Sequence, residues 1–453
     1  MNEIEIITTA SLGDTSYLLV SGDEAALVDP QRDSWELMES CASRGVRIRY
    51  ALETHVHNDY VSGALEVRAA TGATVAGPAR APYAFDHLPL AENDEIAVGD
   101  VIVRAMETPG HTVEHTSYLV FEDTQPVPTA VFTGGSLLVG SAGRTDLSGD
   151  DHTEELARAQ FRSLRRLSPL PDATRVLPTH GAGSSCAAGP VLQDRTTTVG
   201  AERRTNPALT TQDEEEFISQ RLSGCLAPYP AYYQYMAPIN RFGPGVLGGP
   251  PALMPLTPGM AEGMAAGGAQ IVDGRDRGTF AAAHVPGSLC DELDDRFASL
   301  IGEVVPFGTR MVLLLPEPAE EEAAADEAMT QLLRIGYENV AGYLEGGIYA
   351  WQADGRPLRA FGTADVSELA AHTAEVRVLD VRPIRPEGGI PGALAVPLAE
   401  LPGRLDEIPR DREIWTVCGS GRRAIIAASL LDQAGMPVTA VVSGGVQDLM
   451  ALM

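Results

Sequence analysis

The sequence predicts a multidomain protein that combines the α/β and α+β classes, and three features of the chain support this prediction. Its 453 residues exceed what one hydrophobic core normally organises, so we expect about three domains. In the first half, apolar strand-like runs alternate with helix-like segments, without a glycine-rich dinucleotide-binding fingerprint. From about residue 260, a pattern of roughly one hundred residues occurs twice.

Composition and charge limit the partners of the protein. The formal net charge is -29 and the pI is about 4.6. Such an acidic surface is repelled by nucleic acid and by anionic membranes, which argues against both as partners. No apolar window has the length of a membrane span, and the N-terminus lacks a secretory pattern, so we expect a cytoplasmic protein. The five cysteines are scattered without CxxC spacing, which predicts thiols and not a disulfide framework.

The first elements of the chain lead to a histidine-rich loop. The expected elements are two strands within 2–30, with a Gly-Asp turn between Val20 and Ala25, then a helix over 34–44 and a buried strand over 46–52. The loop that follows, ETHVHNDYVSG, contains His55, His57 and Asp59. Imidazoles and carboxylates on the ends of rigid elements are the usual construction of transition-metal sites. Solvated histidines are the alternative, but the whole chain has only nine, and we predict a metal site.

Further polar loops follow apolar runs later in this half. The Pro-Gly turn of TPGHT delivers His111 before a strand-like SYLVF, and PTHG presents His180 after another strand. A glycine-rich loop leads to GRTDL, which contains Asp146, and residues 151–167 have helical spacing with an acidic first turn. If these strand ends open on one face, their side chains gather at one point.

Residues 228–258 are rich in proline, glycine and aromatic residues and show neither the helical nor the strand period. We interpret the stretch as a connection that packs on the surfaces it joins, because four tyrosines would not be left on a mobile tether. The expected divisions are a first domain at 1–240, a linker at 241–259, and two further domains at 260–360 and 361–453.

The repeated pattern is a strand ending in Asp-x-Arg, a short helix, a Pro-Gly turn and a second strand. AQIVDGRDRGTFAAAHVPGSLC at 269–290 matches VRVLDVRPIRPEGGIPGALAVP at 376–397. Each copy continues to another apolar strand, MVLLL in the first and IWTV in the second. The two copies therefore predict two α/β domains with parallel sheets.

The second copy carries a reactive cysteine. Cys418 opens the loop of Gly419, Ser420 and Gly421, which feeds a helix. Backbone N–H groups and the helix N-terminus would stabilise an anion there and lower the pKa of the thiol. The glycines permit tight curvature, and Arg422 or Arg423 adds positive charge.

The first copy departs from this pattern at the same place. After MVLLL it reads PEPAEEEAAADEAM, without cysteine or glycine. An acidic loop would repel an anionic sulfur donor. We therefore predict an inactive copy that is retained for packing, docking or regulation, with Cys290 in its core.

These motifs resemble two known families. The THxHxDxxxG core, TPGHT, GRTDL and ERRTNPALT resemble the metallo-β-lactamase superfamily over about residues 1–240, and within it the persulfide dioxygenases. The two copies at 260–453 resemble tandem rhodanese domains. The resemblance implies an αββα metallo-β-lactamase-like sandwich followed by two rhodanese-like α/β domains with parallel sheets, the first one degenerate.

The resemblance also implies a metal site in which one ligand is missing. Persulfide dioxygenases hold one Fe(II) with two histidines and an aspartate, at positions occupied here by His55, His111 and Gly135. Tyr60 replaces a histidine of the binuclear hydrolases, which argues against two metals. The third ligand stays open between Asp146, His57 and water.

The other polar residues of this half are expected around the ligands. His57 and Asp59 would orient them, and His180 corresponds to the last histidine of the superfamily, also beside the ligands. We expect His87 and His115 to be solvated or in turns.

In rhodaneses the corresponding cysteine carries sulfane sulfur, a role that would fall to Cys418. Arg423 matches the motif arginine, and Asp380 and Arg382 match the supporting pair. The implied enzyme oxidises a low-molecular-weight persulfide, of glutathione, coenzyme A or another thiol, with O2 to sulfite. Cys418 would exchange sulfur with thiol, sulfite or thiosulfate, and one Fe(II) per chain, or zinc, would be the cofactor.

Two other interpretations stay open. One is a zinc-dependent thioester hydrolase or binding module joined to an active rhodanese domain, and the other is a non-enzymatic persulfide carrier or sensor. In each case we expect a homo-oligomer with neither nucleic acid nor membrane as partner.

Overall fold

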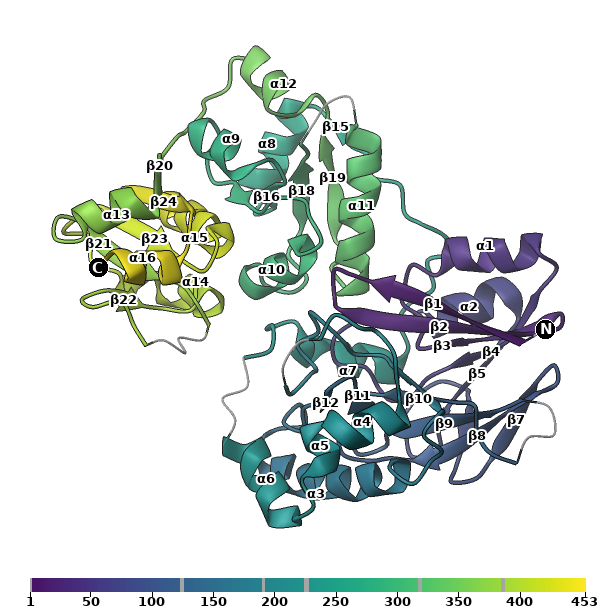
Figure 1. Ribbon diagram of the computed structural model, residues 1–453. Coiled ribbons are helices and arrows are strands. Elements are labelled where there is room, and N and C mark those ends of the chain that lie inside the picture. Colours follow the sequence, from purple (N-terminus) through teal and green to yellow (C-terminus); the bar gives the residue numbers. More distant parts are fainter. Residues whose placement is uncertain (1, 123–125, 190–191, 224–227, 317–319, 384–387) are drawn as a thin grey trace. The chain divides into compact units, whose positions relative to one another are not determined.

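A computed structural model describes residues 2–122, 126–189, 192–223, 228–316, 320–383 and 388–453 (Figure 1). The chain forms two compact units. The first contains most residues up to 229 together with 233–250 and 334–336, and the second contains 230–232, 251–333 and 337–453. All histidine motifs lie in the first unit, and both repeats, apart from residues 334–336, lie in the second.

Two six-stranded sheets form the first unit. The first sheet contains, in spatial order, β1 (Asn2–Thr9), β2 (Asp14–Ser21), β3 (Glu24–Val28), β4 (Arg47–Leu52), β5 (Thr74–Pro78) and β6 (Leu88–Leu90). The second contains β14 (Thr197–Thr198), β13 (Arg175–Pro178), β10 (Ala130–Gly134), β9 (Thr116–Phe121), β8 (Val101–Glu107) and β7 (Glu95–Val98). A small ribbon of β11 (Leu137–Leu138) and β12 (Ser141–Ala142) lies outside them.

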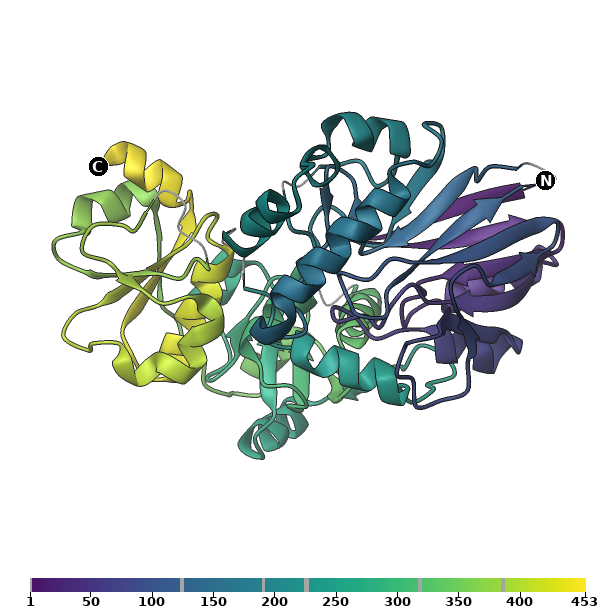
Figure 2. The same cartoon turned by 90° about the horizontal axis from the view of Figure 1, so that it is seen from below.

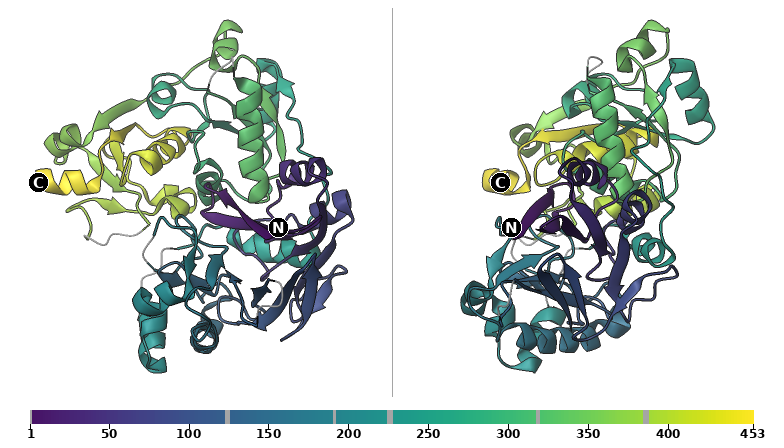
Figure 3. Two further views of the ribbon diagram at one scale, coloured as in Figure 1. Left: turned by 45° about the vertical axis from the view of Figure 1, so that its right-hand side comes forward. Right: turned by 90° about the vertical axis from the view of Figure 1, so that its right-hand side faces the viewer.

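The two sheets pack face to face, and helices cover their outer faces (Figures 1 and 3). Alternate residues such as Tyr17, Leu52, Val103 and Phe132 form the core between the sheets. Each such side chain stabilises the fold by about 2 kcal/mol through burial. The covering helices are α1 (Trp35–Ser43) and α2 (Ala64–Thr71) on one side, and α3 (Asp150–Leu167), α4 (Val199–Thr205), α5 (Pro207–Thr210) and α6 (Glu214–Ser223) on the other. The predicted αββα sandwich is confirmed.

One helix was not expected. α7 (Tyr233–Phe242) lies in the Pro- and Gly-rich stretch that we interpreted as lacking regular structure, and that interpretation is wrong for these residues. Tyr233, Met236 and Asn240 are buried at helical spacing. Pro238 inside the helix disguised this period, because proline normally ends a helix.

The second unit contains two five-stranded sheets with the same topology. The first has the order β15 (Pro255–Leu256), β19 (Val340–Leu344), β18 (Met311–Leu314), β16 (Gln270–Asp273), β17 (Leu289–Cys290). The second has the order β20 (Gly362–Asp365), β24 (Val438–Ser443), β23 (Ile414–Val417), β21 (Arg377–Asp380), β22 (Leu394–Ala395). Every pairing in both sheets is parallel, so the predicted pair of α/β domains with parallel sheets is confirmed.

Helices flank both parallel sheets, and Figure 2 shows them on either side of the strands in the last repeat. The first repeat has α8 (Pro258–Ala266), α9 (Arg277–Ala282), α10 (Phe297–Val304), α11 (Glu321–Arg334) and α12 (Gly347–Ala353). The second has α13 (Val366–His372), α14 (Leu401–Arg404), α15 (Arg422–Gln433), α16 (Val446–Leu452) and two short 3-10 helices, η1 (Leu398–Glu400) and η2 (Leu405–Glu407). In the described ranges, no helix combines the length and the apolar character that crossing a membrane requires.

Candidate metal centre and sulfur-transfer loop

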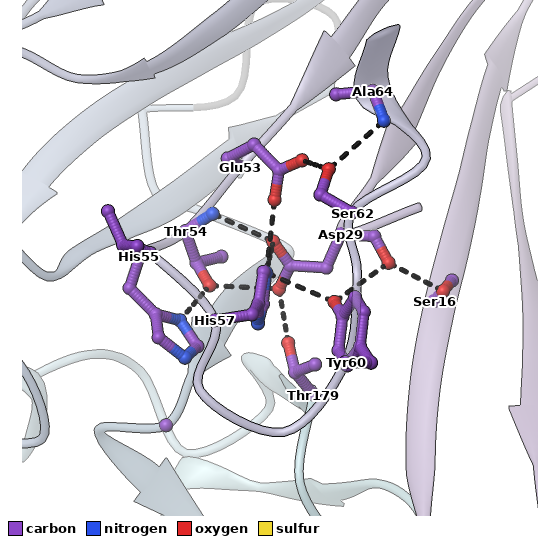
Figure 4. A network of polar contacts seen from close by, with 12 residues as sticks. Ser16, Asp29, Glu53, Thr54, His55, His57, Tyr60, Ser62, Ala64 and Thr179 are labelled. Atoms are coloured by element: carbon purple, nitrogen blue, oxygen red, sulfur yellow. Dashed lines mark hydrogen bonds and ion pairs between the residues drawn. The ribbon is translucent and has the colours of Figure 1, made fainter. Parts of the chain in front are cut away.

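Asp29, at the end of β3, holds the loop that follows β4 (Figure 4). Its carboxylate accepts hydrogen bonds from the Thr54 backbone N–H at 2.7 Å and from the Thr54 hydroxyl at 2.8 Å. The hydroxyl of Thr54 also lies 2.8 Å from Nδ1 of His55. Because Thr54 gives its one proton to Asp29, the Nδ1–H of His55 is the donor in that contact. The Nε2 lone pair of His55 therefore remains for a ligand.

His57 is held through Nε2, whereas His55 is held through Nδ1. Its Nε2 lies 3.0 Å from Glu53 Oε2, 3.0 Å from the Tyr60 hydroxyl and 3.3 Å from Asp29 Oδ1. Burial lowers the pKa of His57, but the two carboxylates outweigh it and raise the pKa well above its usual value. Its Nδ1 is buried and has no hydrogen-bond partner among the described residues.

His111 packs directly on Gly135. The His111 Nδ1–H donates to the Arg144 carbonyl at 2.7 Å, so its Nε2 carries a lone pair, and this buried atom has no partner in the described part of the chain. A Cβ at position 135 would lie 2.1 Å from the His111 ring. An aspartate therefore cannot occupy position 135 unless the ring moves. Burial lowers the pKa of His111 to about 3.

His180, which follows β13, connects these groups. Its Nδ1 lies 2.9 Å from Asp14 Oδ1 and 3.2 Å from Asp59 Oδ2, and its Nε2 lies 3.3 Å from Nε2 of His55. Burial lowers the pKa of His180, but Asp59 and Asp14 outweigh it and raise the pKa to about 10. The carboxylates thus orient the ring of His180 as they do in known metal sites.

The arrangement of these nitrogens fits a metal ion. Two nitrogen ligands about 2.05 Å from a tetrahedral ion lie about 3.3 Å apart, which matches the separation between His55 and His180. The ligand atoms of His55, His57 and His180 lie within 4.8 Å of one another, as do those of His111, His180 and Cys186. Buried lone pairs without partners are costly, and a metal ion would satisfy them.

The other candidate ligands lie elsewhere. Asp146 forms a two-pronged ion pair with Arg144, at 2.6 and 2.7 Å, and it belongs to none of the close groups of metal-ligand atoms found in the described ranges. We expected His115 to be solvated or in a turn; it lies in the loop before β9, but it is not solvated. His115 is fully buried, and its Nε2 accepts from the Gly135 N–H at 2.9 Å. His87 is half-buried.

Asn240, on α7, is a site residue that the sequence did not reveal. Its Nδ2 donates to the carbonyls of His57 and Tyr60, at 2.9 and 2.8 Å. Its Oδ1 accepts from the Ser62 N–H at 2.9 Å. These three bonds fix the backbone of the histidine loop. Asp14, Asp29 and Cys186 were missed as well, since no motif marks them.

A pocket of about 460 Å³ opens beside the histidines. Asn58 and Thr112 lie in its wall, next in sequence to His57 and His111. Two exposed arginines, Arg80 and Arg241, also line it. The remaining lining residues are Val56, Pro82, Val113, Glu114, Leu147, Ser148, Tyr229, Tyr233, Gln234 and Ala237. The two guanidinium groups suit a small molecule with carboxylates.

The cysteine loop of the second repeat joins β23 to α15. Cys418 is buried, at 3% exposure, whereas Gly419 and Ser420 are exposed. Gly421 has φ of 82°, and a Cβ there would lie 2.6 Å from the Val442 carbonyl. The sharp turn therefore requires glycine at this position.

Both arginines after the loop are engaged by the first repeat. Arg422 forms ion pairs with Asp291 at 2.7 Å and with Glu292 at 2.8 Å. Arg423 pairs with Glu303 at 3.1 Å. Carboxylates thus offset the positive charge that we expected to act on the sulfur.

A third arginine does reach the loop. Arg277, on α9 of the first repeat, donates to the Ser420 carbonyl at 2.9 Å. Inside the second repeat, Arg382 forms a two-pronged pair with Asp380, at 2.9 and 2.7 Å, in a buried position.

Comparisons with known proteins agree with this architecture. A family model described as "Metallo-beta-lactamase superfamily" matches residues 12–180, and one described as "Rhodanese-like domain" matches 258–354 and 363–451. A hydroxyacylglutathione hydrolase of Cereibacter sphaeroides is 35% identical over 189 residues, which are 41% of this chain and 69% of that protein. Another strain's enzyme is 33% identical over 48% of this chain and 85% of its own length. A solved structure titled as a metallo-beta-lactamase from Staphylococcus aureus has a TM-score of 0.67 and 27% identity, and the match covers 76% of this chain and 99% of that one.

Proposed function

Since this chain belongs to the metallo-β-lactamase superfamily and carries two rhodanese-like domains, we propose that it is a sulfur enzyme with two activities. The first domain oxidises a low-molecular-weight persulfide with O2 to sulfite and thiol, and the last domain transfers sulfane sulfur through Cys418. The observation that carries the proposal is that one chain joins a buried cluster of histidine lone pairs to a cysteine loop at a helix N-terminus.

The histidines His55, His111 and His180 would hold a single metal ion, and we propose Fe(II). When bound, iron would supply redox chemistry and open coordination positions for O2 and the substrate sulfur. Thr54 keeps the Nδ1 proton on His55, and the Arg144 carbonyl does the same for His111. Both rings therefore present Nε2 as the ligand atom.

The lining of the pocket favours, as substrate, the persulfide of a small thiol that carries negative charge. Arg80 and Arg241 line it, and guanidinium groups bind carboxylates with paired hydrogen bonds. Glutathione persulfide has two carboxylates and a sulfane sulfur, which fits both the charge and the size of the cavity.

The sulfur-transfer step belongs to Cys418. Its thiolate attacks the outer sulfur of R–S–SH, the S–S bond breaks, and the thiol leaves as R–S⁻ while Cys418 becomes a persulfide. Attack by sulfite on the outer sulfur of that deprotonated persulfide then releases thiosulfate and restores the thiolate. The N–H groups at the start of α15 favour the anionic sulfur in both steps.

Oxygen uptake tests the first activity. Iron-loaded protein should consume O2 and form sulfite when it receives glutathione persulfide, and Cys418→Ser should still do so. His55→Ala and His111→Ala should not, whereas the control His87→Ala should. If iron-containing protein consumes no O2 with glutathione or coenzyme A persulfide, the proposed oxidation of persulfides by the first domain is wrong.

A second candidate is thioester hydrolysis by the first domain, which the hydroxyacylglutathione hydrolase relatives favour. Tyr60 and Gly135 argue against the binuclear form of such a site. Hydrolysis of a glutathione thioester by zinc-loaded protein, without O2 uptake on persulfides, would select this alternative.

A further inference from the structure

We propose that Cys186 is a ligand of the metal ion in the first domain and takes the place of the carboxylate that position 135 lacks. Together with His55, His111 and His180 it would complete a His3Cys set. This inference rests on the single metal site of the proposed function, and it names the missing ligand of that site.

The three side chains converge in a buried place. The ligand atoms of His111, His180 and Cys186 lie within 4.8 Å of one another. Each of the three residues is at most 1% exposed. A tetrahedral ion needs sulfur and nitrogen ligands at about 2.3 and 2.05 Å, about 3.6 Å from each other, so small rotations of the side chains would bring the three atoms into coordination distance.

The backbone at residue 144 ties two of these ligands together. The Arg144 carbonyl accepts from Nδ1 of His111 at 2.7 Å, and the Arg144 N–H donates to the Cys186 carbonyl at 2.8 Å. The Arg144 side chain also donates to the Ser185 carbonyl at 3.0 Å. One residue therefore positions both the ring and the cysteine, as the outer partners of metal ligands do.

An independent observation indicates that a ligand belongs there. Nε2 of His111 is buried and has no hydrogen-bond partner among the described residues. The bond to Arg144 fixes the ring, so this lone pair cannot turn toward a hydrogen-bond donor elsewhere. A buried acceptor without a partner is destabilising, and a metal ion beside Cys186 would satisfy it.

Two carboxylate positions close to His111 do not offer a further ligand, and Asp59, whose carboxylate lies 3.2 Å from Nδ1 of His180, is in no close group of ligand atoms with His111 in the described ranges. The His111 ring fills the space that a side chain at 135 would occupy, and Asp146 is committed to its ion pair with Arg144. Thiolate and imidazole together suit zinc and iron. On binding, the thiol loses its proton to solvent and a metal–sulfur bond forms, with no change of oxidation state.

The cysteine also borders the substrate pocket. Its sulfur lies 3.9 Å from the hydroxyl of Tyr233, and Tyr233 lines the pocket. A small thiol or persulfide in the pocket is thus placed to reach the ion.

Cobalt(II) provides a test that does not depend on activity, because thiolate ligands give it a charge-transfer absorption in the near ultraviolet. The full chain loaded with Co²⁺ should show this band, and its X-ray absorption spectrum should contain a cobalt–sulfur distance near 2.3 Å. Cys186→Ser should lose the band and bind Co²⁺ at least about tenfold more weakly. The controls Cys41→Ser, at a buried cysteine on α1, and Cys418→Ser should keep both.

An unchanged band and affinity in Cys186→Ser would overturn the inference, as would a cobalt spectrum of the unmutated protein without a sulfur ligand. The spectrum requires no variant, so a Cys186→Ser protein that fails to fold does not remove the test. If cobalt–sulfur ligation is found but iron-loaded protein consumes no O2, the ligand stands and the proposed reaction falls. If Cys186→Ser retains full iron and O2 uptake, the reaction stands and the ligand falls.

Discussion

The two rhodanese-like repeats share one frame and differ at one loop. Their sheets have the same strand order, and the fourth strand in each order, β16 or β21, ends at the aspartate of a buried Asp-x-Arg pair of nearly equal geometry. Asp273 pairs with Leu314 and Asp380 pairs with Val417 in register. The residues that follow Leu314 and Val417 therefore occupy equivalent positions in the two repeats. They are Leu315 in the first repeat and Cys418 in the second. Burial maintains the frame in both copies, whereas the chemistry depends on the loop.

The helix that follows the loop shows the same contrast. α11 begins with Glu321 and Glu322, whereas α15 begins with Arg422 and Arg423. The acids of the first repeat, such as Glu292 and Glu303, bind the arginines of the second. The first repeat thus provides ion-pair partners for the helix that follows the cysteine loop of the second.

The substitution Cys418→Ser removes the chemical difference between the repeats. We expect sulfur transfer from glutathione persulfide to sulfite, measured as thiosulfate, to fall by on the order of 10³-fold or more, because the nucleophile is lost. Cys290→Ser, at the buried cysteine on β17, should leave the specific activity of folded protein unchanged. Equal losses in both variants would contradict the assignment.

Moving the cysteine to the first repeat tests whether sulfur transfer requires the residues around the thiol as well as the thiol itself. The double variant Cys418→Ser, Leu315→Cys should stay at least about 100-fold below the unmutated protein in the same assay, because acidic residues at the start of α11 disfavour an anionic sulfur. Recovery to near the original rate would show that the frame alone suffices for catalysis.

The Asp-x-Arg pairs of the two repeats should contribute equally to stability but unequally to sulfur transfer. Arg275→Ala and Arg382→Ala each remove an arginine that forms a two-pronged ion pair with a buried aspartate, and we expect each to lower the free energy of unfolding by about 3 kcal/mol in urea titrations. Only Arg382→Ala should also slow sulfur transfer by the folded fraction. A rate loss of the same size in Arg275→Ala would break the division of roles.

The smallest effect concerns the contact of Arg277 with the cysteine loop. Arg277→Ala removes the hydrogen bond to the Ser420 carbonyl and the ion pair with Glu292, and we expect sulfur transfer to fall about fivefold, equivalent to about 1 kcal/mol. The exposed Arg310 of the same repeat provides the matched control, Arg310→Ala. No difference between the two variants would show that the contact is not used in catalysis.

Sequence patterns predicted the layers of the fold and the repeat, because both follow from apolar periodicity. They also predicted His55, His111 and Cys418 as candidates, since motifs at strand ends mark them. They did not indicate that Arg422 faces Glu292, some 130 residues away, because such pairs depend on tertiary packing. Asn240 was hidden for a local reason, as Pro238 obscured the period of its helix.

The mass of the cysteine-containing peptides after incubation with glutathione persulfide tests the central claim most directly. We expect one added sulfur atom on the peptide that contains Cys418, removed by sulfite, and none on the peptide that contains Cys290. An unmodified Cys418 peptide, or a persulfide found on the first repeat instead, would contradict it.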